Sequence, residues 1–405
     1  MEPVDPEMSV GDRIKWWRER RGINQAALAG RVGRSRSWLC QIENGTRQLD
    51  SFSAILDLAR ELRVKPWDLT GHRGDLAPDS QYPHPSMPAI RAAMDAVVFD
   101  APDSEPSVDA LARRVHDAWH QWFTDPSRFD ATGRDLPELL REAQVTVRQL
   151  DGAQRREAMR QLSLVYQLLR MFAKRTGSFV DALRAADRAI AIAQDAGDMP
   201  LMAAAMWTLA VSHSSMGELE QSLDVSEQAA RMLRVGLEDA IPEHMAMWGQ
   251  THLIQAVVHG RMKRKDRVWE ALSTAGRAAE RIGERNDFWT AFGPTNVNIH
   301  AVNAAVEMGE PDEALHIART VDSSVVPSVE RRFSHEMQIA SIYGQRRDDE
   351  ACLFSLLNAE RVSPQNARYS ISMAELTRGM LRRENRLAHR AEARRLGFKI
   401  GVLTI

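Results

Sequence analysis

The sequence predicts an all-α protein, with a small helical domain at the N-terminus followed by a long array of antiparallel helix pairs. Three observations support this fold class. Residues 24–45 have the apolar spacing of two short helices joined by a tight turn. From about residue 107 onward, helical periodicity continues without any segment of strand-like alternation. Within that stretch, a short motif recurs at steps of 38 to 49 residues.

The N-terminal pair of helices is defined by its boundary residues. Residues 26–32 place their apolar side chains on one helical face, and Gly33 ends that helix because the position needs a positive φ. Ser35 is a natural N-cap for the next helix, which runs to Gly45. Two helices joined in this way form a helix-turn-helix, and that unit places its second helix in the major groove of DNA.

The N-terminal segment 9–70 resembles the Cro/C1 (Xre) family of DNA-binding domains. The resemblance rests on three motifs: "NQAALA" at 24–29, "QIENG" at 41–45 and "VKPWDL" at 64–69. It implies a five-helix, lambda-repressor-like fold. The three further helices of that fold would span residues 10–20, 51–62 and 66–69.

The same resemblance implies which residues contact DNA. Base reading would fall to Arg36, Ser37 and Gln41, since Arg and Gln can each form two hydrogen bonds with one base. The residues matching positions that touch phosphates are Gln25, Ser35, Asn44 and Arg47. Arg34 and Trp38 complete the predicted set.

Two further features of this segment concern its packing. Trp38 and Cys40 depart from the family pattern; Trp38 would pack on a thymine methyl group, on the DNA backbone or on the neighbouring helix. Arg18 and Glu43 match a family pair that ties the first helix to the end of the recognition helix.

The charge distribution places nucleic-acid affinity at the N-terminus. Nine basic and three acidic residues lie between positions 11 and 47, whereas the whole chain has a formal net charge of −2. Attraction to phosphate is therefore concentrated in the N-terminal domain. The sequence predicts a double-stranded DNA operator as a partner of that domain.

Residues 71–106 are expected to form a linker with one short helix, at 89–99, because glycine, proline and polar residues interrupt the apolar periodicity.

No apolar run approaches the ~18 residues of a membrane span, and the acidic N-terminus lacks the apolar stretch of a signal peptide. Cys40 and Cys352 lie in different predicted domains, which disfavours a disulfide. We expect a cytoplasmic protein without membrane association.

Residues 107–400 are predicted to form a tetratricopeptide-like α-solenoid. Five motifs each place a small residue before a leucine: "GSFVDAL", "GELEQSL", "KDRVWEAL", "GEPDEAL" and "RDDEACL", with leucines at 183, 223, 272, 315 and 353. The small residue allows close crossing of paired helices, and the leucine enters the core between pairs. Steps longer than the 34 residues of the standard repeat indicate lengthened units. The basic runs 261–267 and 386–395 are interpreted as exposed helix ends or faces, or alternatively as docking sites for a partner or DNA.

In such arrays the first helix of each pair lines a concave groove. Asparagine amides in the groove suit an extended peptide, because each donates to and accepts from a peptide backbone. The segment 288–300, "FWTAFGPTNVNIH", adds aromatic residues that either roof a pocket or fill the core between repeats. The repeat frame brings these residues to the groove: Gln167, Trp207, Val211, Asn296, Asn303, Ser334, Met337 and Ser341, with Phe292 as the aromatic candidate.

No catalytic pattern supports an enzyme. Phosphate-binding loops, nucleophile elbows and paired-cysteine motifs are absent, and His116 and His120 lack a third ligand at matching spacing. We therefore expect neither a cofactor nor a metal.

The domain order of this chain resembles that of peptide-sensing quorum regulators, which implies a homodimeric transcription regulator that senses a peptide or small-molecule effector. The alternative is a DNA-localised scaffold whose array recruits a protein partner.

Overall fold

The computed structural model describes residues 8–45, 49, 52–64, 68–69, 84–96, 107–326, 328–383 and 388–403. Within these residues, regular structure is helical apart from an isolated bridge between Arg285 and Phe292. The predicted all-α fold class, a helix-turn-helix domain followed by helix pairs, is confirmed. None of the described helices is both long and apolar enough to cross a membrane.

The chain divides into two compact units. The first contains α1 to α4 and, from Phe333 onward, α17 to α21; residues 215–217 group with it. The second contains α6 to α16 and the start of α17 up to Arg332. The last part of the predicted array, from Phe333 onward, therefore belongs to the same unit as the N-terminal domain.

The N-terminal domain contains four described helices. Its helices are α1 (Val10–Arg20), α2 (Gln25–Arg31), α3 (Arg36–Glu43) and α4 (Phe52–Leu62). Ser9 and Asp12 form a capping box on α1, Asn24 caps α2, and Gly33 has a φ of +65° in the turn before α3. Of the predicted fifth helix, 66–69, only residues 68 and 69 are described.

The domain core is formed by apolar side chains from α1 to α4, which include Ile14, Leu28, Leu39, Ile42 and Ile55. Gly11 allows α1 to approach the end of α3 closely, because a Cβ there would lie 2.1 Å from the carbonyl oxygen of Ile42. The close contact of these two helices therefore requires glycine at this position.

The first unit is completed by helices from the C-terminal part of the chain. They are α17 (Val329–Arg346, from Phe333), α18 (Asp349–Val362), α19 (Pro364–Tyr369), α20 (Ile371–Leu381) and α21 (Arg390–Lys399). They share a core that includes Phe333, Leu353, Leu356 and Met373.

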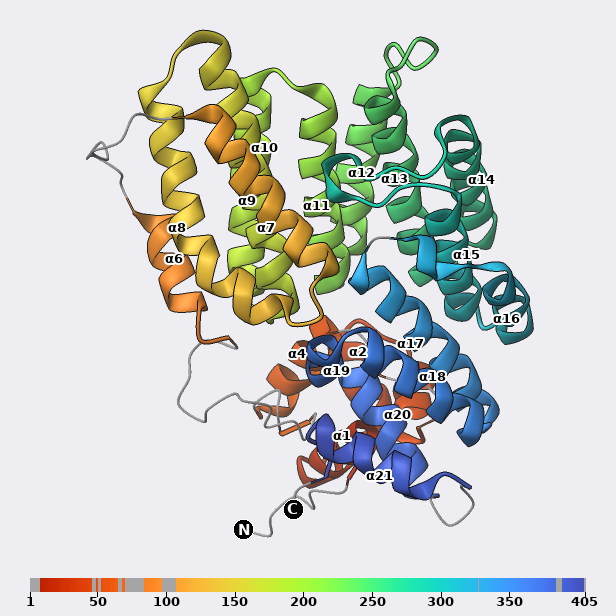
Figure 1. The fold of residues 1–405 in the computed structure, drawn as a ribbon. Coiled ribbons are helices and arrows are strands. Elements are labelled where there is room, and N and C mark those ends of the chain that lie inside the picture. Colours follow the sequence, from red (N-terminus) through yellow and green to blue (C-terminus); the bar gives the residue numbers. More distant parts are fainter. Residues whose placement is uncertain are drawn as a thin grey trace. The chain divides into compact units, whose positions relative to one another are not determined.

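The second unit is a stack of antiparallel helix pairs, in which α9 packs on α8 and α10, α13 on α12 and α14, and α15 on α16 (Figure 1). It begins with α6 (Met87–Asp95), where a short helix at 89–99 was expected; residues 97–106 lie outside the described part of the chain. The following helices are α7 (Val108–Thr124), α8 (Arg128–Gln149), α9 (Gly152–Arg175), α10 (Phe179–Ala196), α11 (Met199–Met216), α12 (Leu219–Leu233), α13 (Pro242–Arg261), α14 (Lys265–Ile282), α15 (Pro294–Met308) and α16 (Pro311–Thr320), with short 3-10 turns at Asp287–Trp289 and Ser323–Val325.

The five motifs open the second helix of five pairs, namely α10, α12, α14, α16 and α18. The small residue before each leucine is buried, with an exposed fraction between 0% and 6%. Four of the leucines are buried as well, whereas Leu183 is only half-buried. The small residues therefore lie where paired helices cross.

Each of these pairs is joined by the same left-handed turn. The residue two positions before the second helix has a positive φ, and the next residue donates its N–H to a carbonyl five positions earlier. Glycine holds three of these positions, while Lys263 and Arg347 adopt φ values of +61° and +59°. A side chain there costs about 1–2 kcal/mol, so the turn is imposed by the packing of the pair.

Candidate nucleic-acid interface and effector site

The recognition helix α3 presents three of the predicted DNA-contacting side chains to solvent. Arg36, Ser37 and Gln41 are exposed. The Ser35 hydroxyl accepts a hydrogen bond from the N–H of Trp38 at 3.1 Å and so caps the helix as expected. Asn44 is exposed at the other end of α3, where its amide donates to Cys40 Sγ at 3.3 Å. The predicted DNA-contacting side chains described here therefore lie along the exposed face of α3 and at its two ends.

Trp38 is partly buried and packs against the core of the domain. The Arg34 guanidinium lies 5.6 Å from the centroid of its ring. Trp38 thus makes the intramolecular contact that was one of its expected placements, and its contact with DNA stays a prediction. Arg47, which the sequence assigned to phosphate contact, lies outside the described residues.

A buried ion pair ties α1 to the end of α3. Arg18 Nε and Nη2 donate to the two carboxylate oxygens of Glu43 at 2.6 and 2.8 Å, and both side chains are buried. This hydrogen bonding raises the pKa of Arg18 above its usual value, although burial opposes the shift. Gln25 Nε2 also donates to Glu43, at 2.9 Å. This interaction of Gln25 was not expected from the sequence, and its predicted contact with phosphate stays a prediction.

The predicted effector residues are distributed over both units. Gln167 on α9 and Asn296 on α15 are buried, while Val211 on α11 and Asn303 on α15 are half-buried. Trp207 lies in the core around α11 and α13. Ser334, Met337 and Ser341 lie on α17 beyond Phe333 and therefore belong to the first unit.

The aromatic residues before α15 pack within the second unit. Phe292 is fully buried, and a Cβ on Gly249 of α13 would lie 2.0 Å from its ring. Trp289 is stacked on Trp119 of α7, with ring centroids 5.8 Å apart and an interplanar angle of 2°. Phe288, Trp289 and Ala291 all have a positive φ, which is costly for non-glycine residues. The contacts of these rings hold the strained segment in place.

Sequence reasoning missed a group of buried and half-buried cations in the second unit. Arg128 and Arg170 are 0% and 2% exposed. The available signal was the spacing of Arg170 and Lys174, which lie four residues apart on the otherwise apolar helix α9 and so share one face.

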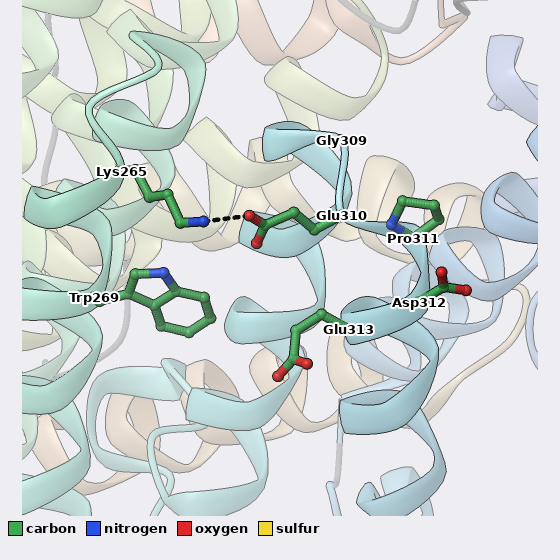
Figure 2. A pocket seen from close by; sticks show the side chains of 7 residues that line it. All are labelled: Lys265, Trp269, Gly309, Glu310, Pro311, Asp312 and Glu313. Carbon is green, nitrogen blue, oxygen red and sulfur yellow. Dashed lines mark hydrogen bonds and ion pairs between the residues drawn. The ribbon is translucent and has the colours of Figure 1, made fainter.

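A separate pocket of about 580 Å³ lies between α14 and α16 (Figure 2). It is lined by Lys265, Trp269 and the residues 309–313, and Lys265 is paired with Glu310. None of the predicted effector residues lines it. His116 and His120 stack at 6.3 Å, and the described residues hold no group of three or more ligand side chains suited to a metal.

Comparison with known proteins identifies the N-terminal domain. Residues 9–69 match the family model described as a helix-turn-helix domain. The chain is similar to Bacillus thuringiensis PlcR in complex with the peptide PapR7 and DNA, at 12% identity and a TM-score of 0.29, covering 67% of this chain and 95% of that one. It is also similar to yeast Tom70, at 10% identity and a TM-score of 0.48, covering 98% of this chain and 71% of that one. No curated protein sequence matches. The chain thus joins an N-terminal helix-turn-helix domain, which is a DNA-binding unit, to an array of antiparallel helix pairs.

Proposed function

We propose that this protein is a cytoplasmic, sequence-specific transcription regulator of the Xre type, whose helical array senses a peptide or small-molecule effector. The observation that carries the DNA-binding part is the exposed face of α3 with Arg36, Ser37 and Gln41, held by the Ser35 cap within a matched helix-turn-helix domain. Arg and Gln at base edges each contribute about 1–3 kcal/mol of discrimination. The face therefore suits direct reading of the major groove.

A binding selection from randomised duplex DNA, followed by affinity measurements on the selected operator, tests this assignment. Arg36→Ala should weaken operator binding by about 1–3 kcal/mol and relax the preference at one base position. Lys15→Ala removes the same charge from the exposed side of α1 and should affect all sequences alike. An unchanged base preference in Arg36→Ala would show that the register is wrong.

We further propose that the regulator acts as a homodimer. A single domain of this size buries little surface on DNA, and helix-turn-helix proteins bind two-fold sites about one helical turn apart. Light scattering at micromolar concentration should give twice the chain mass, at least when operator is present. A monomer mass under both conditions would contradict the proposal.

Sensing requires that an effector binds the DNA-competent and DNA-incompetent states with different affinity. Asn303 is half-buried on α15, on the same helical face as Asn296 and His300. Operator affinity of the wild type should shift when native-host extract is added, and Asn303→Ala should reduce that shift without changing the affinity measured in its absence. A response to extract in neither protein would favour the interaction scaffold.

A further inference from the structure

Six basic side chains gather in the second unit; two of them, Arg128 and Arg170, are buried and the other four are half-buried. They come from four helices: Arg128 on α8, Arg170, Lys174 and Arg175 on α9, Arg261 on α13, and Arg331 on α17. Arg170, Arg175, Arg331 and Arg261 all act electrostatically on Lys174, and Arg128, Arg331 and Arg170 act on Arg175. We call these six residues the basic cluster.

One carboxylate, Glu330, pairs with part of the cluster. It contacts Arg175 and lies 3.5 Å from Arg128. Arg128 also donates to the carbonyl oxygen of Trp122 at 3.1 Å, and its guanidinium lies 4.3 Å from the centroid of the Trp122 ring. Glu330 and Trp122 therefore contribute to the stabilisation of Arg128 at one side of the cluster.

Two other cations of the cluster, Arg170 and Arg331, contact neutral groups. Arg170 Nε donates to the Ser212 hydroxyl at 2.9 Å, and Arg331 Nη1 lies 3.4 Å from His300 Nε2. Arg170 Nη2 is buried and has no hydrogen-bond partner among the residues that the structure describes. A buried guanidinium N–H without an acceptor is costly, and an anionic oxygen is the acceptor that satisfies it best.

The electrostatics of the cluster favour the same kind of ligand. Burial lowers the pKa of Arg170 and Arg175 to about 9, so both remain protonated at neutral pH. Burial and the four surrounding arginines lower the pKa of Lys174 well below its usual value. Buried charges are normally retained where they are paired, and an added anion would compensate several of these cations at once.

Uncharged polar groups lie on the face of α13 that carries Arg261 and on the face of α15 that carries His300, which contacts Arg331. Both amide atoms of Asn296 and of Gln250 are buried and lack a hydrogen-bond partner within the described part of the chain. Asn296 precedes His300 by one helical turn on α15, and Gln250 precedes Arg261 by three turns on α13. These amides suit the polar, uncharged remainder of a ligand whose anionic end lies at the cluster.

We propose that the basic cluster is the binding site for an anionic group, a carboxylate or a phosphate, on the effector of this protein, with Arg170 as its central donor. This inference rests on the proposed sensing function and adds the chemical class of the ligand. The site lies within one unit and requires no residue of the first.

Calorimetric titration of the full chain at constant ionic strength tests the proposal, with sodium pyrophosphate as the phosphate probe and sodium citrate as the carboxylate probe. At least one probe should bind saturably, and the stronger one identifies the group. Arg170→Gln should weaken that binding at least tenfold. Arg231→Gln, which removes an exposed charge on α12, is the matched control and should bind like the wild type. Absence of saturable binding to the wild type, or equal weakening in both variants, would overturn the site.

A second variant remains informative if Arg170→Gln folds poorly. Lys174→Met removes an amine whose protonated form is disfavoured by burial and by the surrounding arginines, while keeping a long side chain, so it should raise the Tm measured without probe and diminish the rise in Tm that the probe produces. A lower Tm without probe, or an undiminished response, would contradict the proposal. Operator affinity of the same proteins separates the two ideas: loss of sequence-specific DNA binding in the wild type rejects the proposed function, whereas normal DNA binding without anion binding rejects only this site.

Discussion

Asp12 in α1 accepts a hydrogen bond from Arg382, with 2.9 Å between Oδ2 and Nη1, although 370 residues separate them. Beside this pair, the backbone N–H of Val10 donates to Glu375 Oε2 at 3.0 Å. Burial alone would raise the pKa of Asp12, but hydrogen bonds from Ser9 and Arg382 outweigh it, and the pKa lies below its usual value. The N-terminal end of α1 is therefore held by α20 and the residue that follows it.

This contact predicts a local effect of removing Glu375. Glu375→Ala leaves the buried N–H of Val10 without its acceptor, so local opening should become about 1–3 kcal/mol easier. Hydrogen exchange at the Val10 amide measures this directly. Glu360→Ala, which breaks a pair with Lys399 on other helices of the same unit, should leave the exchange of Val10 as it is. Identical Val10 exchange in the wild type and Glu375→Ala would show that the contact is not maintained in solution.

The pair formed by Arg18 and Glu43 predicts a large loss of stability when it is broken. Glu43→Ala strands the buried Arg18 guanidinium and should lower the free energy of unfolding by about 3–5 kcal/mol. The loss is measured by chemical denaturation of the full chain, with the unfolding of the N-terminal domain as the transition that is recorded. Glu19 contacts Arg18 from an exposed position, so Glu19→Ala should cost less than about 1 kcal/mol. Similar losses in the two variants would argue against a special role for the buried pair.

Gly11 and Gly30 give a matched pair of substitutions in the N-terminal domain. Gly11→Ala drives a methyl group into the backbone of α3, and we expect destabilisation of at least about 1–3 kcal/mol. At Gly30, within α2, an added Cβ meets nothing within 4 Å, so Gly30→Ala should stabilise the helix by about 0.5–1 kcal/mol. Thermal melting of both variants checks the opposite signs.

Two half-buried histidines predict loss of stability in acid. Burial lowers the pKa of His252 to about 4, and burial together with Arg331 lowers that of His300 to about 3. The unfolded chain therefore binds more protons between those values and pH 6.5, so stability falls as the pH falls through this range. From pH 7 to pH 5, each histidine should cost about 2 kcal/mol. Urea unfolding at the two pH values measures the loss, and His252→Gln should make it smaller; an equal loss in this variant would exclude His252 as a cause.

Features encoded within a few neighbouring residues were predictable from the sequence. The Ser35 cap, the Gly33 turn and the starts of five second helices depend on local capping and turn chemistry. The left-handed turns at Lys263 and Arg347 show the limit of this reasoning, because neither residue favours a positive φ. The recurring small residue before a leucine still marked those pairs.

Contacts between distant parts of the chain were settled by tertiary packing. Neither the bond from Gln25 to Glu43 nor the stacking of Trp289 on Trp119 follows from any local pattern. The run 261–267 was interpreted as exposed, yet Arg261 donates to Ser214 and belongs to the basic cluster. A single cation on a helix is indistinguishable from a solvated charge until neighbouring helices pack around it. The candidate anion site depends on burial and on the proximity of other charged side chains, and both arise only when the helix pairs assemble.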